Sequence, residues 1–155
     1  MQVFNDVYPA DPEQMQALIE KGPKGPIFMV NLLKFRDKAE YEDGRATTLT
    51  GREAYNIYGR AVTDLLPKFG GHAVFAADVT FLSLGRVEEL WDEVAIAAYP
   101  ERGAMVRMSL SQEWREIAVH RTAGLKGQLN IETVLAEDVA PDWLKKIAAT
   151  VGSAA

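Results

Sequence analysis

A chain of 155 residues suits one domain, and its content of 48% hydrophobic and 25% charged residues is typical of a soluble globular protein. The net charge of −5 argues against nucleic acid or an anionic membrane as the main partner, and the lack of cysteine excludes disulfides and thiolate chemistry. The sequence shows no signal-peptide pattern and no apolar run of membrane-spanning length, so we expect a cytoplasmic protein.

Hydrophobic periodicity, capping residues and Gly or Pro breaks predict the secondary structure along the chain. The predicted elements in chain order are a short helix at 10–22, a strand at 27–35, a polar loop at 36–49, a helix from 50 to the glycine pair at 70–71, strands at 72–85 and 91–99, a helix at 101–124, a strand at 127–137 and a last helix that begins at Pro141. Asp11 is the expected N-cap of the first helix, and Thr50 with Glu53 forms a capping box for the second. The long helix is expected to be interrupted near Ser109–Ser111.

The central elements follow the order β-α-β-β-α-β, which is the ferredoxin-like pattern. We therefore predict a single α+β domain over residues 1–155, with its core at about 25–137 and an extra helix at each end. Helices of this fold cover only one face of the sheet. Because the predicted strands are apolar on both faces, we expect two chains to pack sheet against sheet as a homodimer that forms a dimeric α+β barrel. Its interior would suit a small-molecule ligand.

The first predicted strand, in the segment GPIFMVNLLKF, carries Asn31 and Lys34 within an otherwise apolar run. Alternation places Asn31 on one face of the strand and Lys34 on the other. Either side chain can be a polar group that points into a ligand pocket or lies at its mouth. In the alternative interpretation, Asn31 bonds to the backbone near a bulge and Lys34 extends its ammonium group to solvent at the strand end.

Four segments together resemble one known family: GPIFMVNLLKFR, TGREAYNIYG, WDEVAIAAYPERGA and SQEWREIAVHRTAGL. They are similar to the domain of unknown function 1330 family over most of residues 25–131. The resemblance implies a dimeric α+β barrel and little about activity, since such barrels include cofactor-free monooxygenases, muconolactone-type isomerases, haem enzymes and non-catalytic stress proteins. In one departure, Glu101 stands where many members have serine, so a ligand bound by that serine would be bound differently here.

The two histidines are candidates for moving a proton. His120 is followed by Arg121 near a helix end, where a histidine can act as a general base and an arginine can bind a carboxylate or an enolate. Alternatively, both are cations that stabilise a helix C-terminus. His72 opens a strand, and it is a candidate ligand contact, an axial haem ligand or an ordinary surface or core residue. The spacing of the histidines matches no zinc signature, so we expect no metal site.

Aromatic side chains supply the remaining candidates. Tyr55 and Tyr58 share the apolar stripe of the second helix, so they either pack in the core or form a pocket wall that donates hydrogen bonds to a substrate carbonyl. The predicted substrate-binding residues are Tyr55, His72, Trp91, Tyr99 and Arg121.

Motifs for nucleotide binding and for a serine nucleophile are missing, so we expect no organic cofactor. The main hypothesis is an enzyme acting on a small apolar carbonyl or lactone-like compound, as an isomerase, a lyase or a monooxygenase-like protein. Asn31, Lys34 and Tyr58 would stabilise charge on the carbonyl oxygen, and His120 or His72 would move the proton. The alternatives are a ligand-binding module with the same cavity and a structural dimer with a filled interior.

Overall fold

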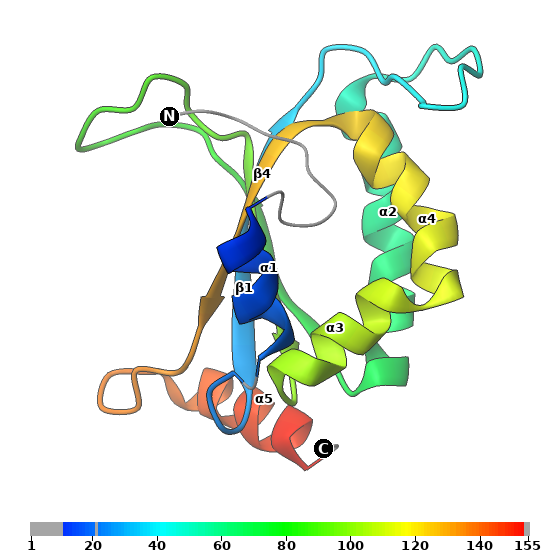
Figure 1. Ribbon diagram of the computed structural model, residues 1–155. Helices are drawn as coiled ribbons and strands as arrows, with labels where there is room; N and C mark the ends of the chain where they lie inside the picture. The colour runs from blue at the N-terminus through cyan, green and yellow to red at the C-terminus, as the bar shows by residue number, and fades with distance from the viewer. Residues whose placement is uncertain (1–10, 21, 154–155) are drawn as a thin grey trace.

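The computed structural model describes residues 11–20 and 22–153, which form one four-stranded sheet flanked by helices (Figure 1). The strands are β1 (Ile27–Phe35), β2 (His72–Asp78), β3 (Glu93–Tyr99) and β4 (Leu125–Thr133). The helices are α1 (Pro12–Ile19), α2 (Gly51–Leu65) continued by the 3-10 helix η1 (Leu66–Phe69), α3 (Arg102–Leu110), α4 (Gln112–Gly124) and α5 (Asp142–Gly152).

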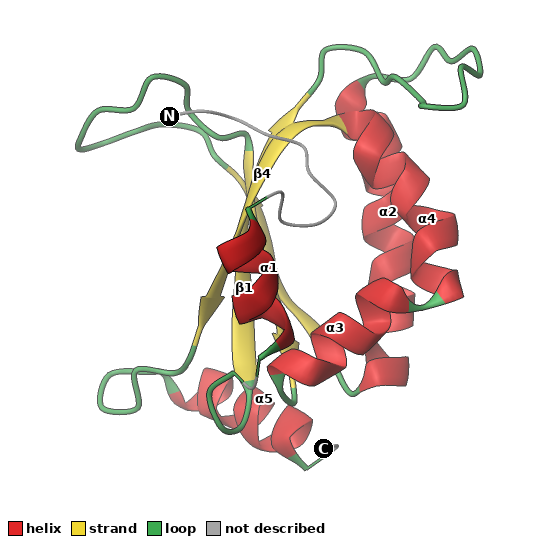
Figure 2. Cartoon of the chain, viewed as in Figure 1, coloured by secondary structure: helices red, strands yellow, loops and turns green. Residues whose placement is uncertain are grey.

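The sheet has the strand order β2–β3–β1–β4, and every neighbouring pair is antiparallel. This order with the connections β1-α2-β2 and β3-α3-α4-β4 is the ferredoxin-like fold, so the predicted fold class is confirmed. Helices α2, α3 and α4 lie along one side of the sheet, and α5 lies at one end of it (Figure 2). The main core fills the space between the sheet and these three helices, where Ile27 and Met29 pack against Leu65 and Trp114.

Helix ends follow the local sequence signals closely. Asp11 accepts a hydrogen bond from the Glu13 N–H at 2.8 Å, and Thr50 with Glu53 forms a complete capping box. The long helix is interrupted as predicted, and Ser111 is the N-cap of its second part: the Ser111 side chain accepts from the Trp114 N–H at 3.1 Å. The first helix ends at Ile19, before the end of the predicted range at residue 22.

Strand ends differ from the sequence prediction where tertiary contacts decide them. β2 stops at Asp78 instead of residue 85, and it has a bulge between Ala73 and Phe75. The bulge places Phe75 opposite Ile96, so Phe75 lies on the opposite face of the sheet from Ala73, although regular alternation would put both on one face. β4 begins two residues earlier than expected because Leu125, which is fully buried, pairs with Phe35.

Helices α2 and α4 approach each other through two glycines. A side-chain carbon on Gly124 would lie 2.8 Å from the Tyr55 backbone nitrogen and closer still to the Gly51 carbonyl oxygen. A side-chain carbon on Gly51 would lie 2.7 Å from the Arg36 nitrogen. Both positions therefore require glycine, and this close approach fixes α2 and α4 side by side above the sheet.

The loop between β1 and α2 is tied to the C-terminal end of α4. The Ala39 N–H donates to the Leu49 carbonyl, and the Glu40 N–H donates to the Ala123 carbonyl, both at 3.0 Å. The Tyr41 hydroxyl shares a hydrogen bond of 2.7 Å with Nδ1 of His120. Any movement of residues 36–49 away from the helices would have to break these contacts.

The sheet face that α2, α3 and α4 do not cover is apolar. At one end, Phe28 and Ala98 pack against Val151 of α5. Beyond α5, large hydrophobic side chains are exposed on this face: Phe75 at 49%, Leu129 at 37% and Ile131 at 44%. Exposed apolar side chains gathered on one sheet face are typical of a surface that another molecule covers.

Candidate functional site

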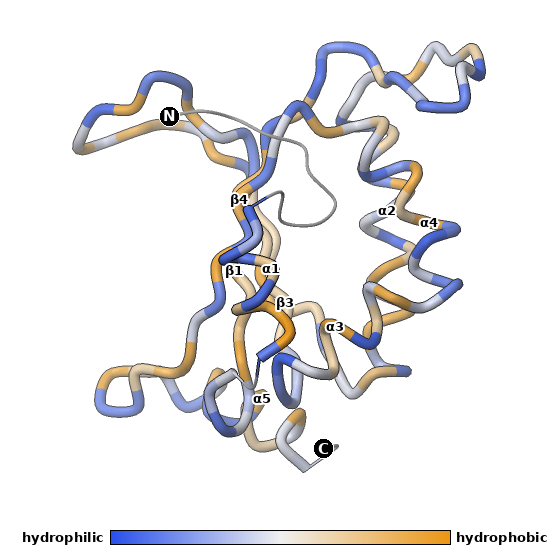
Figure 3. Tube along the Cα trace, viewed as in Figure 1, coloured by the Kyte–Doolittle hydropathy of each residue, from blue (hydrophilic) through white to orange (hydrophobic). Residues whose placement is uncertain are grey.

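The edge strand β4 has its polar and apolar faces reversed. Residues 128, 130 and 132 (Gln, Asn and Glu) point toward the helices, whereas Leu129 and Ile131 point to the uncovered face. Figure 3 shows this alternation of hydropathy along β4. In an ordinary two-layer domain the helix-covered face of the sheet is the apolar one. The reversal therefore marks the helix-covered side of β4 as a candidate site.

Three amide side chains form a connected row on this side of the sheet. Asn31 of β1 lies on the same face as the buried Met29 and Leu33, directly opposite Asn130 in the sheet register. Its Oδ1 accepts two hydrogen bonds of 2.6 Å, from Nε2 of Gln128 and from Nδ2 of Asn130. We call Asn31, Gln128 and Asn130 the amide row.

The orientation of every amide in the row is fixed from its two ends. Nδ2 of Asn31 donates to two backbone carbonyls, those of Met29 at 3.1 Å and Ala95 at 3.3 Å, so its oxygen must face Gln128 and Asn130. At the other end, Oε1 of Gln128 accepts from Nε of Arg121 at 2.9 Å and from Nη2 at 2.6 Å. Since a guanidinium only donates, Gln128 must turn its oxygen to Arg121 and its NH₂ group to Asn31.

Arg121 contributes a buried positive charge at one end of the amide row. It belongs to the last turn of α4 and is only 6% exposed. Asn31 and Gln128 are partly exposed and Asn130 is exposed, so solvent reaches the row itself. The site therefore combines a buried cation with amide N–H donors that a small molecule can reach.

Tyr58 of α2 packs against the hydrophobic residues on both sides of Asn31. Its ring contacts the core cluster around Met29 and also the cluster around Leu33, the two residues that flank Asn31 on this face. Its hydroxyl oxygen accepts a hydrogen bond of 3.2 Å from Nε1 of Trp114. The Tyr58 hydroxyl is thus the acceptor for the indole N–H, and its own hydrogen points away from Trp114.

The tyrosines at this site stay protonated at neutral pH. Burial raises the pKa of Tyr55, Tyr58 and Tyr99 above the usual value of 10.0, because a phenolate is poorly solvated there. The positive charge of Arg121 acts in the opposite direction and lowers the pKa of Tyr55 and Tyr58. This influence of Arg121 is consistent with both hydroxyls lying close to the guanidinium. They add neutral hydrogen-bond donors to the site.

Beyond Asn130, the polar side of β4 continues with an ion pair that also holds α1. Glu132 binds Arg102 of α3 through two hydrogen bonds of 2.7 Å. The same guanidinium donates to the carbonyl of Ala17 in α1 at 2.7 Å. Arg102 therefore neutralises Glu132 and attaches α1 beside the end of the amide row.

The structure brings five of the predicted site residues together on the helix-covered side: Asn31, Tyr55, Tyr58, Tyr99 and Arg121. Tyr55 contacts Tyr58 with ring centres 5.5 Å apart, and Tyr99 is buried in the main core. Of the two alternatives for Asn31, the side chain bonds to backbone carbonyls and faces the helices of its own chain, so it does not point to the uncovered sheet face.

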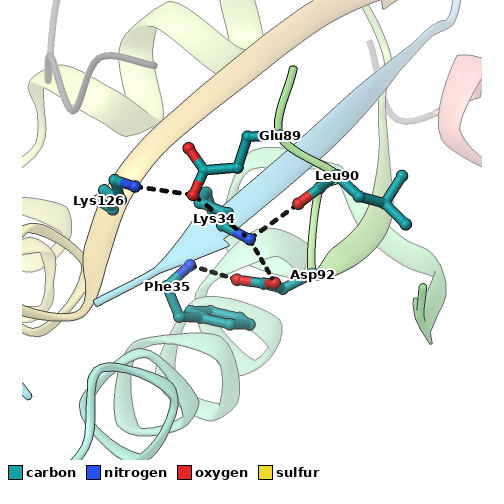
Figure 4. A network of polar contacts seen from close by, with 6 residues as sticks. All are labelled: Lys34, Phe35, Glu89, Leu90, Asp92 and Lys126. Atoms are coloured by element: carbon teal, nitrogen blue, oxygen red, sulfur yellow. Dashed lines mark hydrogen bonds and ion pairs between the residues drawn. The ribbon is translucent and has the colours of Figure 1, made fainter. Parts of the chain in front are cut away.

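Lys34 does not join this group. Its ammonium group, on the opposite side of β1, donates to the Leu90 carbonyl at 2.8 Å and to Asp92 Oδ1 at 2.9 Å, and lies 3.7 Å from Glu89 (Figure 4). The other Asp92 oxygen accepts from the Phe35 N–H at 2.8 Å. Lys34 thus holds the segment before β3 against the end of β1, which accounts for its place in an apolar strand.

The remaining predicted residues also lie elsewhere. His120 is engaged with Tyr41 of the loop, and its neighbour Arg121 turns to the sheet, as expected for adjacent positions on a helix. His72 is exposed on the edge strand β2, opposite Ala98. Trp91 is buried but lies just before β3, which begins at Glu93 instead of residue 91 as predicted. These positions do not support the roles that the sequence analysis gave to Lys34 and the two histidines.

Sequence reasoning missed Gln128 and Asn130. The signal is present in the segment QLNIE, where polar and apolar residues alternate strictly. Alternation alone does not tell which face is covered by helices, so Gln128 and Asn130 read as the solvent side of an ordinary strand.

The described part of the chain lacks two further features. Among residues 11–20 and 22–153, no group of three or more His, Asp or Glu side chains is placed to hold a metal ion. None of the helices in these residues is both long and apolar enough to cross a membrane.

Comparison with solved structures identifies a relative. The protein RPA0582 of Rhodopseudomonas palustris, of unknown function, is 31% identical, covers 86% of this chain and 97% of its own, and superposes with a TM-score of 0.72. Its methylated form gives 33% identity, 87% and 100% coverage and a TM-score of 0.74. This chain belongs to the same family.

More distant matches add little to this family assignment. A dimeric protein of unknown function with a ferredoxin-like fold from Bacteroides fragilis is 11% identical, with coverage of 71% and 96% and a TM-score of 0.48. No family model and no curated protein matches the chain. The relative that shows the family is thus a protein of unknown function.

Proposed function

We propose that the protein binds a small, largely apolar compound through a carbonyl-type oxygen, between the sheet and helices α2 and α4. The proposal rests on the amide row, because the row places polar donors on the sheet face that is normally shielded from water by helices. The surrounding side chains of Met29, Leu33, Tyr55 and Tyr58 would contact the apolar part of the ligand.

The proposed site stabilises negative charge on the bound oxygen. Each amide NH₂ group has two hydrogens, and the contact with Asn31 uses one hydrogen of Gln128 and one of Asn130. The second hydrogens would be donated to the ligand oxygen, with Arg121 adding a positive charge behind Gln128. Asn31, whose oxygen and nitrogen each already make two bonds, would act as a positioning residue that aims its neighbours.

A more specific form of this proposal is that the protein is an enzyme that acts without an organic cofactor. Donors that polarise a carbonyl suit an isomerase, a lyase or a monooxygenase-like reaction on a small ketone or lactone. The Tyr58 hydroxyl is the group best placed to donate a proton, since its oxygen is held by Trp114. A non-catalytic binding protein with the same site is the second candidate, and it is favoured by the positions of Lys34 and both histidines away from the amide row.

We also infer a homodimer that forms through the uncovered sheet face. The support is the cluster of exposed Phe75, Leu129 and Ile131 on that face. The further inference that this family is the domain of unknown function 1330 family rests on the resemblance of the four sequence segments.

The test is an NMR titration of the full chain with cyclohexanone and δ-valerolactone, two neutral carbonyl compounds. We expect them to shift the side-chain NH₂ signals of Gln128 and Asn130, each assigned by single substitution. The NH₂ signal of Asn56, which is exposed on α2, is the internal control. Signals of the amide row that do not move, or that move no more than that of Asn56, would refute the proposed site for neutral carbonyl ligands. Turnover lost in Tyr58→Phe with ligand binding retained would then favour the enzyme.

A further inference from the structure

We infer that two copies of this chain hold each other by a reciprocal contact, in which the β2–β3 loop of each chain packs on the partner's segment that leads into α5. This inference rests on the homodimer proposed above and specifies its arrangement. It goes beyond that proposal in requiring contacts outside the sheet face, and it fixes which ends of the two sheets lie together. We call residues 79–92 the arm and residues 134–143 the corner.

The arm and the corner project from opposite ends of the sheet, both toward its uncovered side. The arm joins Asp78 of β2 to Glu93 of β3, and these two residues pair at one end of the sheet. The corner follows Thr133 of β4, which pairs with Phe28 at the other end. Figure 1 shows the arm as the green loop at the upper left and the start of the corner as the orange loop at the lower left, whereas α2 and α4 lie to the right of the sheet. A partner on the uncovered face would therefore lie between the two projections.

Both segments carry large apolar side chains that the single chain leaves in solvent. In the arm, Phe81 is 77% exposed and Leu84 is 89% exposed. In the corner, Val139 is 80% exposed and Trp143 is 53% exposed. Apolar side chains scattered over a surface need no explanation, but exposed ones gathered in two projections beside an apolar face are typical of contacts with another molecule.

The arm is held at its base by bonds to the rest of the sheet. Lys34 of β1 pairs with Asp92 at 2.9 Å, and Lys126 of β4 donates to Glu89 at 2.7 Å (Figure 4). Across the base, the Val79 N–H donates to the Asp92 carbonyl at 2.9 Å. These bonds fix the direction of the arm before any partner binds, and a preorganised contact loses less entropy on association.

The position of α5 decides which two-fold arrangement can form. α5 packs on one end of the uncovered face, where Val151 contacts Phe28 and Ala98. A two-fold axis that brings two such faces together lies between them, and it runs either along or across the strands. An axis along the strands would set the two α5 helices back to back, and two helices of about 10 Å each would separate the sheets at that end.

An axis across the strands avoids this double layer. It places each α5 opposite the end of the partner's sheet that α5 leaves uncovered, so that the two helices share one layer between the sheets. The same rotation exchanges the two ends of the sheet and so brings each arm to the partner's corner. The arrangement therefore pairs the exposed apolar side chains of the arm with those of the corner twice in each dimer.

The sheet patch alone is small for a specific dimer, which buries about 800 Å² on each partner. Phe75, Leu129 and Ile131 are each less than half exposed, so at about 200 Å² for a large side chain they contribute less than about 300 Å². The two arm residues Phe81 and Leu84, with Val139 and Trp143 of the corner, add roughly 500 Å² on the same scale. The arm and the corner thus supply the area that the sheet patch lacks.

The experiment is site-specific cross-linking, because the chain has no cysteine of its own. Leu84→Cys and Val139→Cys are introduced together into the full-length protein, which is then treated with bismaleimidoethane, a short thiol-to-thiol cross-linker. We expect a covalent dimer on denaturing gels, since each arm reaches the partner's corner. Neither single variant should cross-link by itself, whereas a mixture of the two single variants should.

Controls separate this contact from random collisions and measure its contribution. Leu84→Cys combined with Leu110→Cys should give no covalent dimer, because Leu110 is 56% exposed but belongs to α3 on the helix side of the sheet. In sedimentation equilibrium, Phe81→Ser with Leu84→Ser should raise the dissociation constant at least roughly 100-fold, and Leu110→Ser should leave it unchanged. Unfolding midpoints confirm that each variant is folded.

Each outcome decides a different part. Cross-linking through Leu84→Cys alone would place arm against arm and overturn the reciprocal contact, while the proposed homodimer would stand. A dimer that is weakened by Ile131→Lys but not by the arm variant would have the same meaning. A monomer at all concentrations would overturn both the homodimer and this inference. Phosphatidylcholine vesicles that bind the unmodified protein but not the arm variant, with the dimer unchanged in both, would assign the arm to a membrane surface and overturn the inference.

Discussion

Replacing Ile131 with Lys should dissociate the proposed dimer. Ile131 lies on the uncovered face of β4 and is 44% exposed in the single chain. Full burial of an isoleucine side chain contributes about 1.5 to 3 kcal/mol, so burying the exposed part in a dimer contributes about 1 kcal/mol per chain. By two-fold symmetry each substitution acts twice, which makes the loss about 2 kcal/mol. This loss corresponds to a dissociation constant raised roughly 30-fold, before any cost of burying the ammonium groups.

Sedimentation equilibrium over a range of protein concentrations measures this change directly. Ile57→Lys is the matched control, because Ile57 is 41% exposed but lies on α2, away from the uncovered face. We expect a dimer for the unmodified protein and for Ile57→Lys, and a shift to monomer for Ile131→Lys. A monomeric unmodified protein, or equal dissociation constants for the two variants, would refute the argument from the apolar face.

Two predictions concern stability. Gly124→Ala places a carbon against the backbone of α2, and it should lower the free energy of unfolding in urea by about 1 to 3 kcal/mol. The control is Gly59→Ala, whose added carbon meets nothing within 4 Å and should stabilise α2 by about 0.5 to 1 kcal/mol. No change in the free energy of unfolding for Gly124→Ala would show that the two helices can separate freely. For His120, burial and then the charge of Arg45 lower the pKa below 6.5, so the folded state binds a proton less readily than the unfolded state does. Its contribution to stability is therefore complete above about pH 6.5 and is lost as the pH falls from there through the lowered pKa. Unfolding of the protein and of His120→Gln at pH 7.5 and pH 5 should show the smaller acid destabilisation in the variant, and an equal loss in both would contradict the assignment.

Local sequence signals were sufficient for much of the fold. The capping box of Thr50 and Glu53 and the bounded apolar run at 27–35 lie where they were predicted, because a cap bonds to its own turn and a strand needs a continuous apolar stretch. Strand ends were less well predicted. The extent of β2 and β4 depends on partner strands, and no local pattern records where a partner stops.

For the site, the sequence supplied most of the residue types but not their grouping. Asn31, Tyr58 and Arg121 were identified individually, yet Lys34 and His120 were included with them although they bond elsewhere. Two neighbours on a strand or a helix can face opposite environments, and only the packing of other elements decides which face is covered.

The sequence by itself determined the element order, the helix caps and the presence of apolar residues on both faces of the sheet, since each of these follows from neighbours along the chain. The tertiary structure alone decided that the helices lie over Gln128 and Asn130 and leave Leu129 and Ile131 uncovered. The bond from Arg121 to Gln128 joins α4 to β4, and the bond from Gln128 to Asn31 joins strands 97 residues apart in sequence. Contacts of this range depend on the packed arrangement of the whole fold, which is why the amide row appears only in three dimensions.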